Sequence, residues 1–151
     1  MNIFGIGPMI AATGVTSFVA VILFRVARGH LSQWAFPREA GIGAGAILVA
    51  VGLYFWLDSV RLIATRFKKD VLITTGVYRF VRNPMYAAFI VFIVPGLSLL
   101  LDDPMITLST ASMLLVFKSG IHREEEYLRE RFGCAYLDYM RRVRQIVPFL
   151  W

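Results

Sequence analysis

The chain has 151 residues, 58% of them hydrophobic and 17% charged, and its mean hydropathy is +0.65. The apolar residues lie in blocks long enough to cross a bilayer, so the composition indicates one integral-membrane domain over 1–151 and excludes an ordinary soluble domain. The net charge of +6 comes mostly from 61–82 and 118–144. Such basic clusters in a membrane protein mark the cytoplasmic side and contacts with anionic lipid, which argues against a nucleic-acid partner.

Two apolar stretches in the N-terminal part, 1–64, are predicted to span the membrane as helices. The first begins near residue 6 and ends at 24 or 27, and the second covers 40–57, with the helix able to continue to 64. The loop between them is too polar to span, and its aromatic residues suit the membrane interface. His30 in this loop is interpreted as a surface histidine, because it has no partner acid or metal-ligand spacing.

The second span carries a face of small residues, Gly41, Gly45 and Gly52, which predicts close packing against another helix. At the end of this span, Asp58 and Arg61 lie one helical turn apart. Two interpretations stay open for this pair of charges. They form an ion pair along the helix, or they line the polar edge of a cavity.

The second half, 65–151, is predicted to hold a basic loop, a helical hairpin and C-terminal helices. The loop covers 65–84, and spans at 85–101 and 105–118 follow it as a tight antiparallel hairpin. Pro95-Gly96 in the first of these spans predicts a kink or tilt. Acidic residues at the hairpin tip and basic residues at its ends place the tip outside and the loop and C-terminus inside. The predicted fold class is therefore an all-α polytopic membrane protein with four spans.

From residue 121 onward the pattern is that of an amphipathic helix, with apolar side chains at intervals of three or four residues. This stripe consists of Leu128, Phe132, Ala135, Tyr136, Tyr139 and Val143. Gly133 interrupts the stripe and predicts a bend or break in the helix. We expect the stripe to lie on the membrane interface or against the hairpin.

The stretch 74–86 concentrates residues that shape a loop and the start of a helix. Gly76 permits a tight turn or the close approach of a ligand to the backbone. Pro84 favours an extended conformation at Asn83 and suits the first turn of a helix. In one interpretation, the free N–H groups at this helix start bind a polar or anionic ligand. In the other, the basic stretch lies on lipid headgroups and binds no specific ligand. Both interpretations stay open at this level.

Three consecutive glutamates, 124–126, follow the last predicted span. Glu125 and Glu126 are each spaced to pair with Arg129 on a solvated helix face. Glu124 lies nearer the apolar stripe, where a carboxylate suits the ammonium end of a ligand; an ordinary salt bridge is its commoner alternative. The sequence has no metal-ligand spacing and no nucleophilic triad, so we expect no metal. The chain is instead rich in groups that position a ligand: aromatic rings, arginines and one isolated carboxylate. These groups suit a reaction whose electrophile arrives already activated on a cofactor.

Two motifs in the second half resemble those of a known family. Residues 76–86 resemble the G-x-Y-x-x-x-R-H-P-x-Y signature of the isoprenylcysteine carboxyl methyltransferase family. Residues 124–139, with Pro148 beyond them, resemble that family's closing E-E-x-x-L-x-x-x-F-G-x-x-Y-x-x-Y motif. The related phospholipid N-methyltransferases share the general layout. The resemblance covers about 72–148 and includes the hairpin between the two motifs.

The resemblance implies an integral-membrane methyltransferase that uses S-adenosylmethionine, releases S-adenosylhomocysteine and acts on a membrane lipid or lipidated substrate. In that family the cofactor lies in a cytosol-facing pocket between the hairpin and the C-terminal helices, and the substrate enters from the bilayer. Carried over by position, the cofactor contacts are Val71, Leu72, Ile73, Tyr78, Asn83, Pro84, Met85, Tyr86 and Glu124. Arg82 and Arg123 are the candidates for positioning the substrate.

Three positions depart from the family pattern. Asn83 stands where the family has a histidine before proline, and an amide cannot titrate. Gly120 stands where the family has an arginine one turn before the glutamate. The basic residues open to that role are Arg82, Lys118 and Arg123. The usual V-P-R near the C-terminus reads Val-Arg-Gln at 143–145. These departures leave the acceptor atom open, and Asn83 and Gly120 keep one alternative, a non-catalytic lipid-binding or assembly protein of the same fold. A nicotinamide-dependent membrane sterol reductase is the further alternative, and the sequence argues against it because such proteins are longer and close with a different C-terminal pattern.

Overall fold

The computed structural model describes residues 7–28, 33–66 and 71–147, and within these residues all regular structure is helical, as predicted. His30 and Pro148 lie outside the described residues. The long helical stretches are α1 (Gly7–Arg28), α2 (Arg38–Arg66), the run α3 (Pro84–Ala87), η3 (Ala88–Ile93) and α4 (Val94–Leu100), and α5 (Thr107–Phe132). The shorter elements are η2 (Gly76–Arg79), η4 (Pro104–Ile106) and α6 (Cys134–Arg142).

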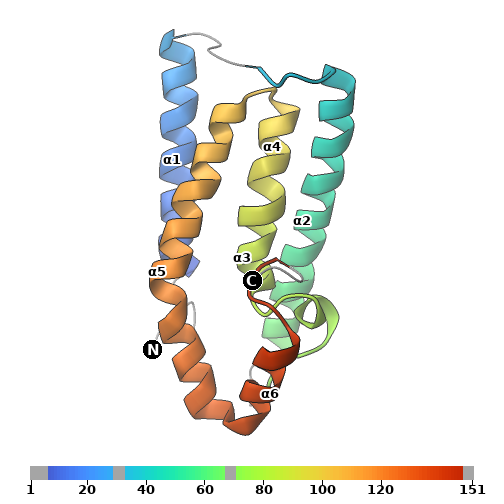
Figure 1. The fold of residues 1–151 in the computed structure, drawn as a ribbon, viewed down its shortest axis with the longest axis vertical. Coiled ribbons are helices and arrows are strands. Elements are labelled where there is room, and N and C mark those ends of the chain that lie inside the picture. The colour runs from blue at the N-terminus through green and yellow to red at the C-terminus, as the bar shows by residue number, and fades with distance from the viewer. Residues whose placement is uncertain (1–6, 29–32, 67–70, 148–151) are drawn as a thin grey trace.

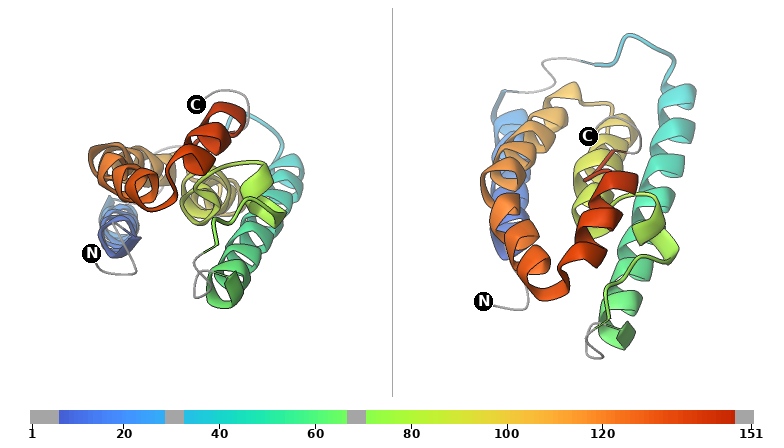
Figure 2. Two further views of the ribbon diagram at one scale, coloured as in Figure 1. Left: turned by 90° about the horizontal axis from the view of Figure 1, so that it is seen from below. Right: turned by 60° about the horizontal axis from the view of Figure 1, so that its bottom comes forward.

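The long helices pack as two pairs, α1 along α5 and α2 along the η3–α4 run (Figure 1). The main apolar core joins the pairs and includes Ile90, Val94, Ile106, Met113 and Phe117. After α5, α6 turns back beside the loop that carries η2 (Figure 2). The irregular segments that follow α2 and α5 therefore gather at one end of the bundle, opposite the hairpin tip.

Two helices are long and apolar enough to cross a membrane, α2 and the helix over 104–132. Only 17% and 28% of their most apolar stretches are buried, so these helices face outward with apolar side chains rather than forming the core of a soluble protein. The apolar helices over 9–24 and 84–100 are shorter. The structure therefore indicates a membrane protein, and crossing by the two shorter helices stays a prediction.

The predicted small-residue face of α2 packs directly against the hairpin. Gly41, Gly45 and Gly52 are all buried. A Cβ atom added to Gly45 would lie 2.7 Å from the carbonyl oxygen of Gly96, and one added to Gly52 would lie 3.0 Å from that of Ala88. The two backbones therefore approach more closely than any side chain would permit. This confirms the predicted packing role of the glycines.

The helix over 84–100 is irregular in the turns before Pro95. Residues Ala88–Ile93 form the π-helical turn η3, and α4 begins at Val94. Pro95 has no N–H group, and its ring crowds the carbonyl of Val91 four residues earlier, so a widened turn accommodates it. An irregularity was predicted at Pro95-Gly96, and the structure places it in the turns that precede the proline.

The hairpin tip is held by polar contacts within it and with the α1–α2 connection. The Asp103 carboxylate accepts the Met105 N–H at 3.0 Å, and the Ser98 hydroxyl donates to the Asp103 carbonyl at 2.7 Å. The Trp34 backbone N–H donates to the Asp102 carboxylate at 3.1 Å, and its indole N–H donates to the Ser98 carbonyl at 3.3 Å. The predicted tight hairpin is therefore present. Trp34, which precedes α2, is hydrogen-bonded to the hairpin tip.

Helix α5 runs without a break from Thr107 to Phe132. The sequence predicts a span that ends near residue 118 and an amphipathic helical pattern from 121, and the structure joins the two in one helix. Phe117 and Ile121 are buried in the same core, so the apolar stripe continues through the junction and stabilises one helix. Gly133 ends α5 with a positive φ of 54°, which confirms the predicted break.

The close contact between α2 and α4 makes Gly45 intolerant of a side chain. We expect Gly45→Ala to lower the free energy of unfolding by about 1–3 kcal/mol, since overpacking pushes the helices apart. The matched control is Gly43→Ala, because Gly43 is exposed and an added Cβ there meets nothing within 4 Å. Thermal unfolding of both variants in one detergent measures the difference. Equal melting temperatures would contradict the close approach of the two backbones.

Candidate functional site

The loop that follows α2 is pinned to that helix at a tight turn. Gly76 has a positive φ of 62° and begins η2. The Asp58 carboxylate accepts the Val77 N–H at 3.0 Å, and a Cβ atom on Gly76 would collide with the same carboxylate. Arg61 lies 3.8 Å from Asp58, so the ion pair along the helix is present. Asp58 therefore determines where the turn that presents Tyr78 begins.

Tyr78 joins this turn to α6. The Tyr139 hydroxyl donates to the Tyr78 carbonyl at 2.5 Å, and the Tyr78 side chain is half-buried. Burial, and then the carboxylates of Asp58 and Glu124, raise the pKa of Tyr78 well above its ordinary value. Burial likewise raises the pKa of Tyr139. Both side chains are therefore neutral at physiological pH and present an aromatic ring with an intact hydroxyl.

The two sequence motifs meet where Tyr86 of α3 contacts Glu124 of α5. The Tyr86 hydroxyl donates to the Glu124 carboxylate, whose two oxygens lie 2.8 and 3.1 Å away. Both side chains are half-buried, and the Tyr86 ring packs edge-on against Phe117 with the centroids 5.5 Å apart. A carboxylate held in this way attracts a cationic group more strongly than a solvated one, because less water screens it.

Arg82 and Glu125 form a buried ion pair beside this contact. Arg82 Nη2 lies 3.1 Å from Glu125 Oε1, and each side chain is only 9% exposed. Gln145 Nε2 donates to the same oxygen at 2.9 Å. The prediction that Glu125 pairs with Arg129 on a solvated face is wrong, because Glu125 lies on the buried side of α5. Glu126, the next residue, is exposed.

Arg82 and Asn83 also carry buried donors without a hydrogen-bond partner among the described residues. These atoms are Arg82 Nε, Arg82 Nη1 and Asn83 Nδ2. An unsatisfied buried donor costs roughly 1–3 kcal/mol. The backbone of the same residues is satisfied, since their N–H groups donate to the carbonyls of Arg144 and Gln145 at 2.7 and 2.9 Å. An oxygen acceptor on a ligand would satisfy the side-chain donors.

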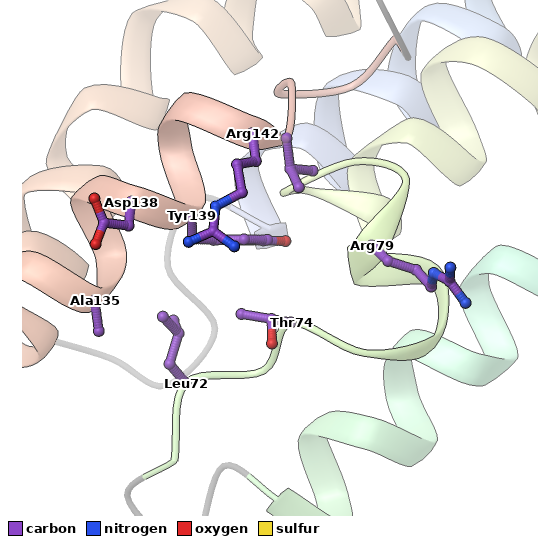
Figure 3. A pocket seen from close by; sticks show the side chains of 8 residues that line it. Leu72, Thr74, Arg79, Ala135, Asp138, Tyr139 and Arg142 are labelled. Atoms are coloured by element: carbon purple, nitrogen blue, oxygen red, sulfur yellow. The ribbon is translucent and has the colours of Figure 1, made fainter.

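A cavity of ≈ 530 Å³ opens between the loop before η2 and helix α6 (Figure 3). Leu72 and Thr74 lie on one side of it, facing Ala135 and Tyr139 of α6 on the other. Its lining is Leu72, Thr74, Arg79, Ala135, Asp138, Tyr139, Arg142 and Val143. Its volume lies within the range of small-molecule sites, but it is an open hollow, and four of its eight lining residues, Thr74, Arg79, Asp138 and Arg142, are polar or charged.

The predicted run over 71–73 is divided among different environments. Leu72 lines the cavity. Ile73 packs against Leu62 and Val77 in a small apolar cluster, and Val71 is exposed. The structure therefore brings Leu72 to the cavity, whereas Ile73 belongs to the packing between the loop and α2.

The other predicted residues lie around the start of α3 and the end of α5. Pro84 is buried and Met85 is half-buried at the start of α3, between Asn83 and Tyr86. Arg123 is exposed on α5, and no contact among the described residues joins it to Arg82. Of the two candidates for substrate positioning, only Arg82 is therefore enclosed by this end of the bundle.

Sequence reasoning missed Gln145 and left the role of Asp58 open. Gln145 bonds a carboxylate 20 residues earlier in the chain, and no local pattern indicates such a partner. Asp58 did carry a signal, because an ionisable residue at the end of an apolar span is costly unless it has a function or a partner. Its partner, the backbone of Val77, becomes visible only when the loop is folded.

The fold and the site together define a helical membrane protein with carboxylate, aromatic and guanidinium groups gathered at one polar end. The sequence model of the phospholipid methyltransferase family matches residues 41–135, and the chain therefore belongs to that family. No solved structure matches the chain significantly.

Several related proteins carry the same name. Protein-S-isoprenylcysteine O-methyltransferase B of Arabidopsis thaliana is 36% identical over 106 residues, which cover 70% of this chain and 51% of that protein. The protein-S-isoprenylcysteine O-methyltransferase of Saccharomyces cerevisiae is 29% identical over 115 residues, covering 70% and 48%. That of Schizosaccharomyces pombe is 34% identical over 92 residues, covering 60% and 39%. These relatives confirm the resemblance drawn from the two motifs, and the chain spans about half or less of their length.

Asp58 should stabilise the fold through the Val77 N–H that it accepts. We expect Asp58→Ala to cost about 1–3 kcal/mol of unfolding free energy, because it leaves that N–H unsatisfied. Asp58→Asn keeps an oxygen acceptor and should cost less. Thermal unfolding of the two variants distinguishes them. Equal destabilisation would mean that the charge opposite Arg61, and not the hydrogen bond, is what the fold needs.

Tyr136 should make the fold sensitive to alkaline pH. Burial, and then the Glu125 carboxylate, raise its pKa to about 12 from an ordinary value of 10.0. Between these values the unfolded chain releases the proton while the folded chain keeps it, so the free energy of unfolding falls as pH rises. Below the ordinary pKa of 10.0, the contribution of Tyr136 to the free energy of unfolding is fully present. Denaturation at a series of alkaline pH values should show a shallower fall in Tyr136→Phe, and an unchanged slope would contradict the shift.

Proposed function

We propose that this chain is an integral-membrane methyltransferase that transfers a methyl group from S-adenosylmethionine to a lipid or lipidated substrate. Its family supports a transferase, and relatives named protein-S-isoprenylcysteine O-methyltransferases support a lipidated acceptor. The observation that carries the proposal is the contact between Tyr86 and Glu124. It joins the two motifs on which the resemblance depends, and it leaves a half-buried carboxylate beside aromatic rings.

The residues present fit this cofactor. The Glu124 carboxylate suits an α-ammonium group, and the ring of Tyr78 or Tyr86 suits a sulfonium cation. The cavity beside Leu72 has the size and apolar wall that an adenosine needs. Asn83 Nδ2, which has no hydrogen-bond partner in the described part of the chain, suits an oxygen of the ligand. We propose direct cofactor contacts at Leu72, Tyr78, Asn83, Tyr86 and Glu124. We propose that the other four residues, Val71, Ile73, Pro84 and Met85, contribute by supporting the loop and the start of α3.

When bound, S-adenosylmethionine supplies an electrophilic methyl group. The chain's own residues then need to bind, orient and exclude water. The Tyr86 hydroxyl holds the Glu124 carboxylate in one orientation. Tyr78 presents a protonated hydroxyl and an aromatic ring, and its raised pKa extends that state to more alkaline pH. Alignment and exclusion of water contribute much of the rate of an in-line displacement, so these positioning roles suffice without a general base.

We assign positioning of the acceptor to Arg82 rather than to Arg123. The Arg82 side chain is only 9% exposed, and its Nε and Nη1 nitrogens have no hydrogen-bond partner among the described residues, whereas Arg123 is exposed. A guanidinium favours an anionic oxygen in a defined geometry. A carboxylate acceptor is already the reactive form and needs no proton removed, so Asn83 in place of a titratable histidine is compatible with it.

We propose that all four helical stretches cross the bilayer, with the site on the cytoplasmic side. The helix over 84–100 would be about 25 Å long at 1.5 Å per residue, close to a hydrocarbon core of about 30 Å. Basic side chains, Arg79 and Arg142 among them, surround the site, and Asp102 and Asp103 lie at the opposite tip. The positive-inside rule supports this orientation.

Binding of S-adenosylhomocysteine tests the cofactor assignment. We expect saturable binding to the wild type by calorimetric titration, and a loss of roughly tenfold or more in Glu124→Gln, since a charge-assisted hydrogen bond contributes about 1.5–3 kcal/mol. Glu126→Gln is the matched control, because Glu126 is the exposed neighbour on the same helix. Folded wild type that does not bind would overturn the assignment. Equal effects of both variants would mean that the acidic run is only a charged surface.

The acceptor class is tested with a labelled methyl group. Purified protein is incubated with methyl-labelled S-adenosylmethionine and, in separate reactions, with a prenylated cysteine or a phospholipid. We expect label in the prenylated cysteine as a carboxyl methyl ester, from which mild base releases labelled methanol. Label in the phospholipid headgroup would instead assign the chain to phospholipid methylation, and label in neither from cofactor-binding protein would favour the non-catalytic alternative.

A further inference from the structure

The chain after α6 is bound across the site end of the bundle. Residues 143–147, called the C-terminal strap below, lie beside the loop before α3. Val81 and Arg144 form an isolated parallel β-bridge, and the N–H groups of Arg82 and Asn83 donate to carbonyls of the strap. Ile146 is only 5% exposed in the main core. The strap lies beyond residues 41–135, where the family model matches.

One carboxylate oxygen adds a side-chain contact between the strap and the rest of the site. Glu125 Oε1 accepts from Gln145 Nε2 at 2.9 Å and lies 3.1 Å from Arg82 Nη2. Three segments far apart in sequence therefore meet on one atom: the loop before α3, helix α5 and the strap. Because Glu125 and Arg82 are each 9% exposed, water is a poor substitute for either partner. Displacing the strap would therefore disturb the ion pair as well.

We propose that Glu125 is a positioning residue of the site, which holds the C-terminal strap closed by binding Arg82 and Gln145 together. The inference rests on the proposed function, because the strap contacts both parts of the proposed cofactor site. Val143 lines the cavity, and the Gln145 carbonyl accepts the backbone N–H of Asn83. This contact therefore supports both the cavity wall at Val143 and the direction of those Arg82 and Asn83 donors that have no partner among the described residues.

Glu125 thus has a different role from its neighbour Glu124. Glu124 accepts the Tyr86 hydroxyl and is half-buried. Glu125 is buried and already has both Arg82 and Gln145 as partners, so its carboxylate acts through them. Removing its charge should therefore loosen the strap first and weaken ligand binding as a consequence.

The test combines hydrogen exchange of the ligand-free protein with titration by S-adenosylhomocysteine. Gln145→Ala is the main variant, because it leaves the Arg82–Glu125 pair in place and should fold. We expect the peptide containing Arg82 and Asn83 to exchange about tenfold faster, with α2 and α4 unchanged. Affinity for S-adenosylhomocysteine should fall about fivefold or more. Glu125→Gln should give larger changes of both kinds, and Glu126→Gln should give neither.

A charge exchange separates positioning from general destabilisation. The double variant Glu125→Gln, Gln145→Glu returns a carboxylate to Arg82 from the strap side. It should recover most of the lost protection and affinity, which a merely weakened fold would not do. Unchanged exchange near Arg82 in Gln145→Ala, or equal acceleration in α2 and α4, would overturn the proposal. Faster local exchange in protein whose wild type binds no S-adenosylhomocysteine would support the strap contact and overturn the proposed function instead.

Discussion

The site depends on keeping the Glu125 carboxylate paired in a place that excludes water. Desolvation of both charges opposes the ion pair with Arg82, so the pair adds little net stability, but losing one partner would leave a buried charge. Its three participants come from different parts of the chain, Gln145 included. The contact therefore selects one arrangement of the loop, α5 and the segment after α6. Tyr86, Glu124 and the cavity take their places within that arrangement.

The rest of the bundle meets a different constraint, because its helices expose apolar side chains and several of their hydroxyl groups donate to carbonyls of the same helix. The Ser59 hydroxyl, for example, donates to the Phe55 carbonyl at 2.6 Å within α2. Glycines let α2 and the hairpin helix touch, where apolar side chains gain little from burial against each other in lipid. Under the proposed function this division has a use, since an apolar acceptor approaches from the bilayer and a polar cofactor from water.

Features with a local cause were predictable. The helices, the glycine face of α2 and the break at Gly133 follow from periodicity, residue size and backbone freedom. The change from a fully apolar to an amphipathic pattern inside α5 left open whether one helix continues through it, and core packing at Phe117 and Ile121 joins the two parts. Glu125 was assigned to Arg129 by helical spacing, which considers only partners on the same helix.

The sequence by itself determined the membrane class, the helical elements and the two motifs, because composition and short-range spacing record them directly. It also placed Tyr86 and Glu124 in one candidate site, through the resemblance of their motifs. Only the tertiary structure decided which of the adjacent glutamates is buried, that Asp58 holds the turn at Gly76, and that Gln145 reaches the same carboxylate as Arg82. The physical reason is that burial and long-range pairing depend on which helix faces meet, and no single segment contains that information.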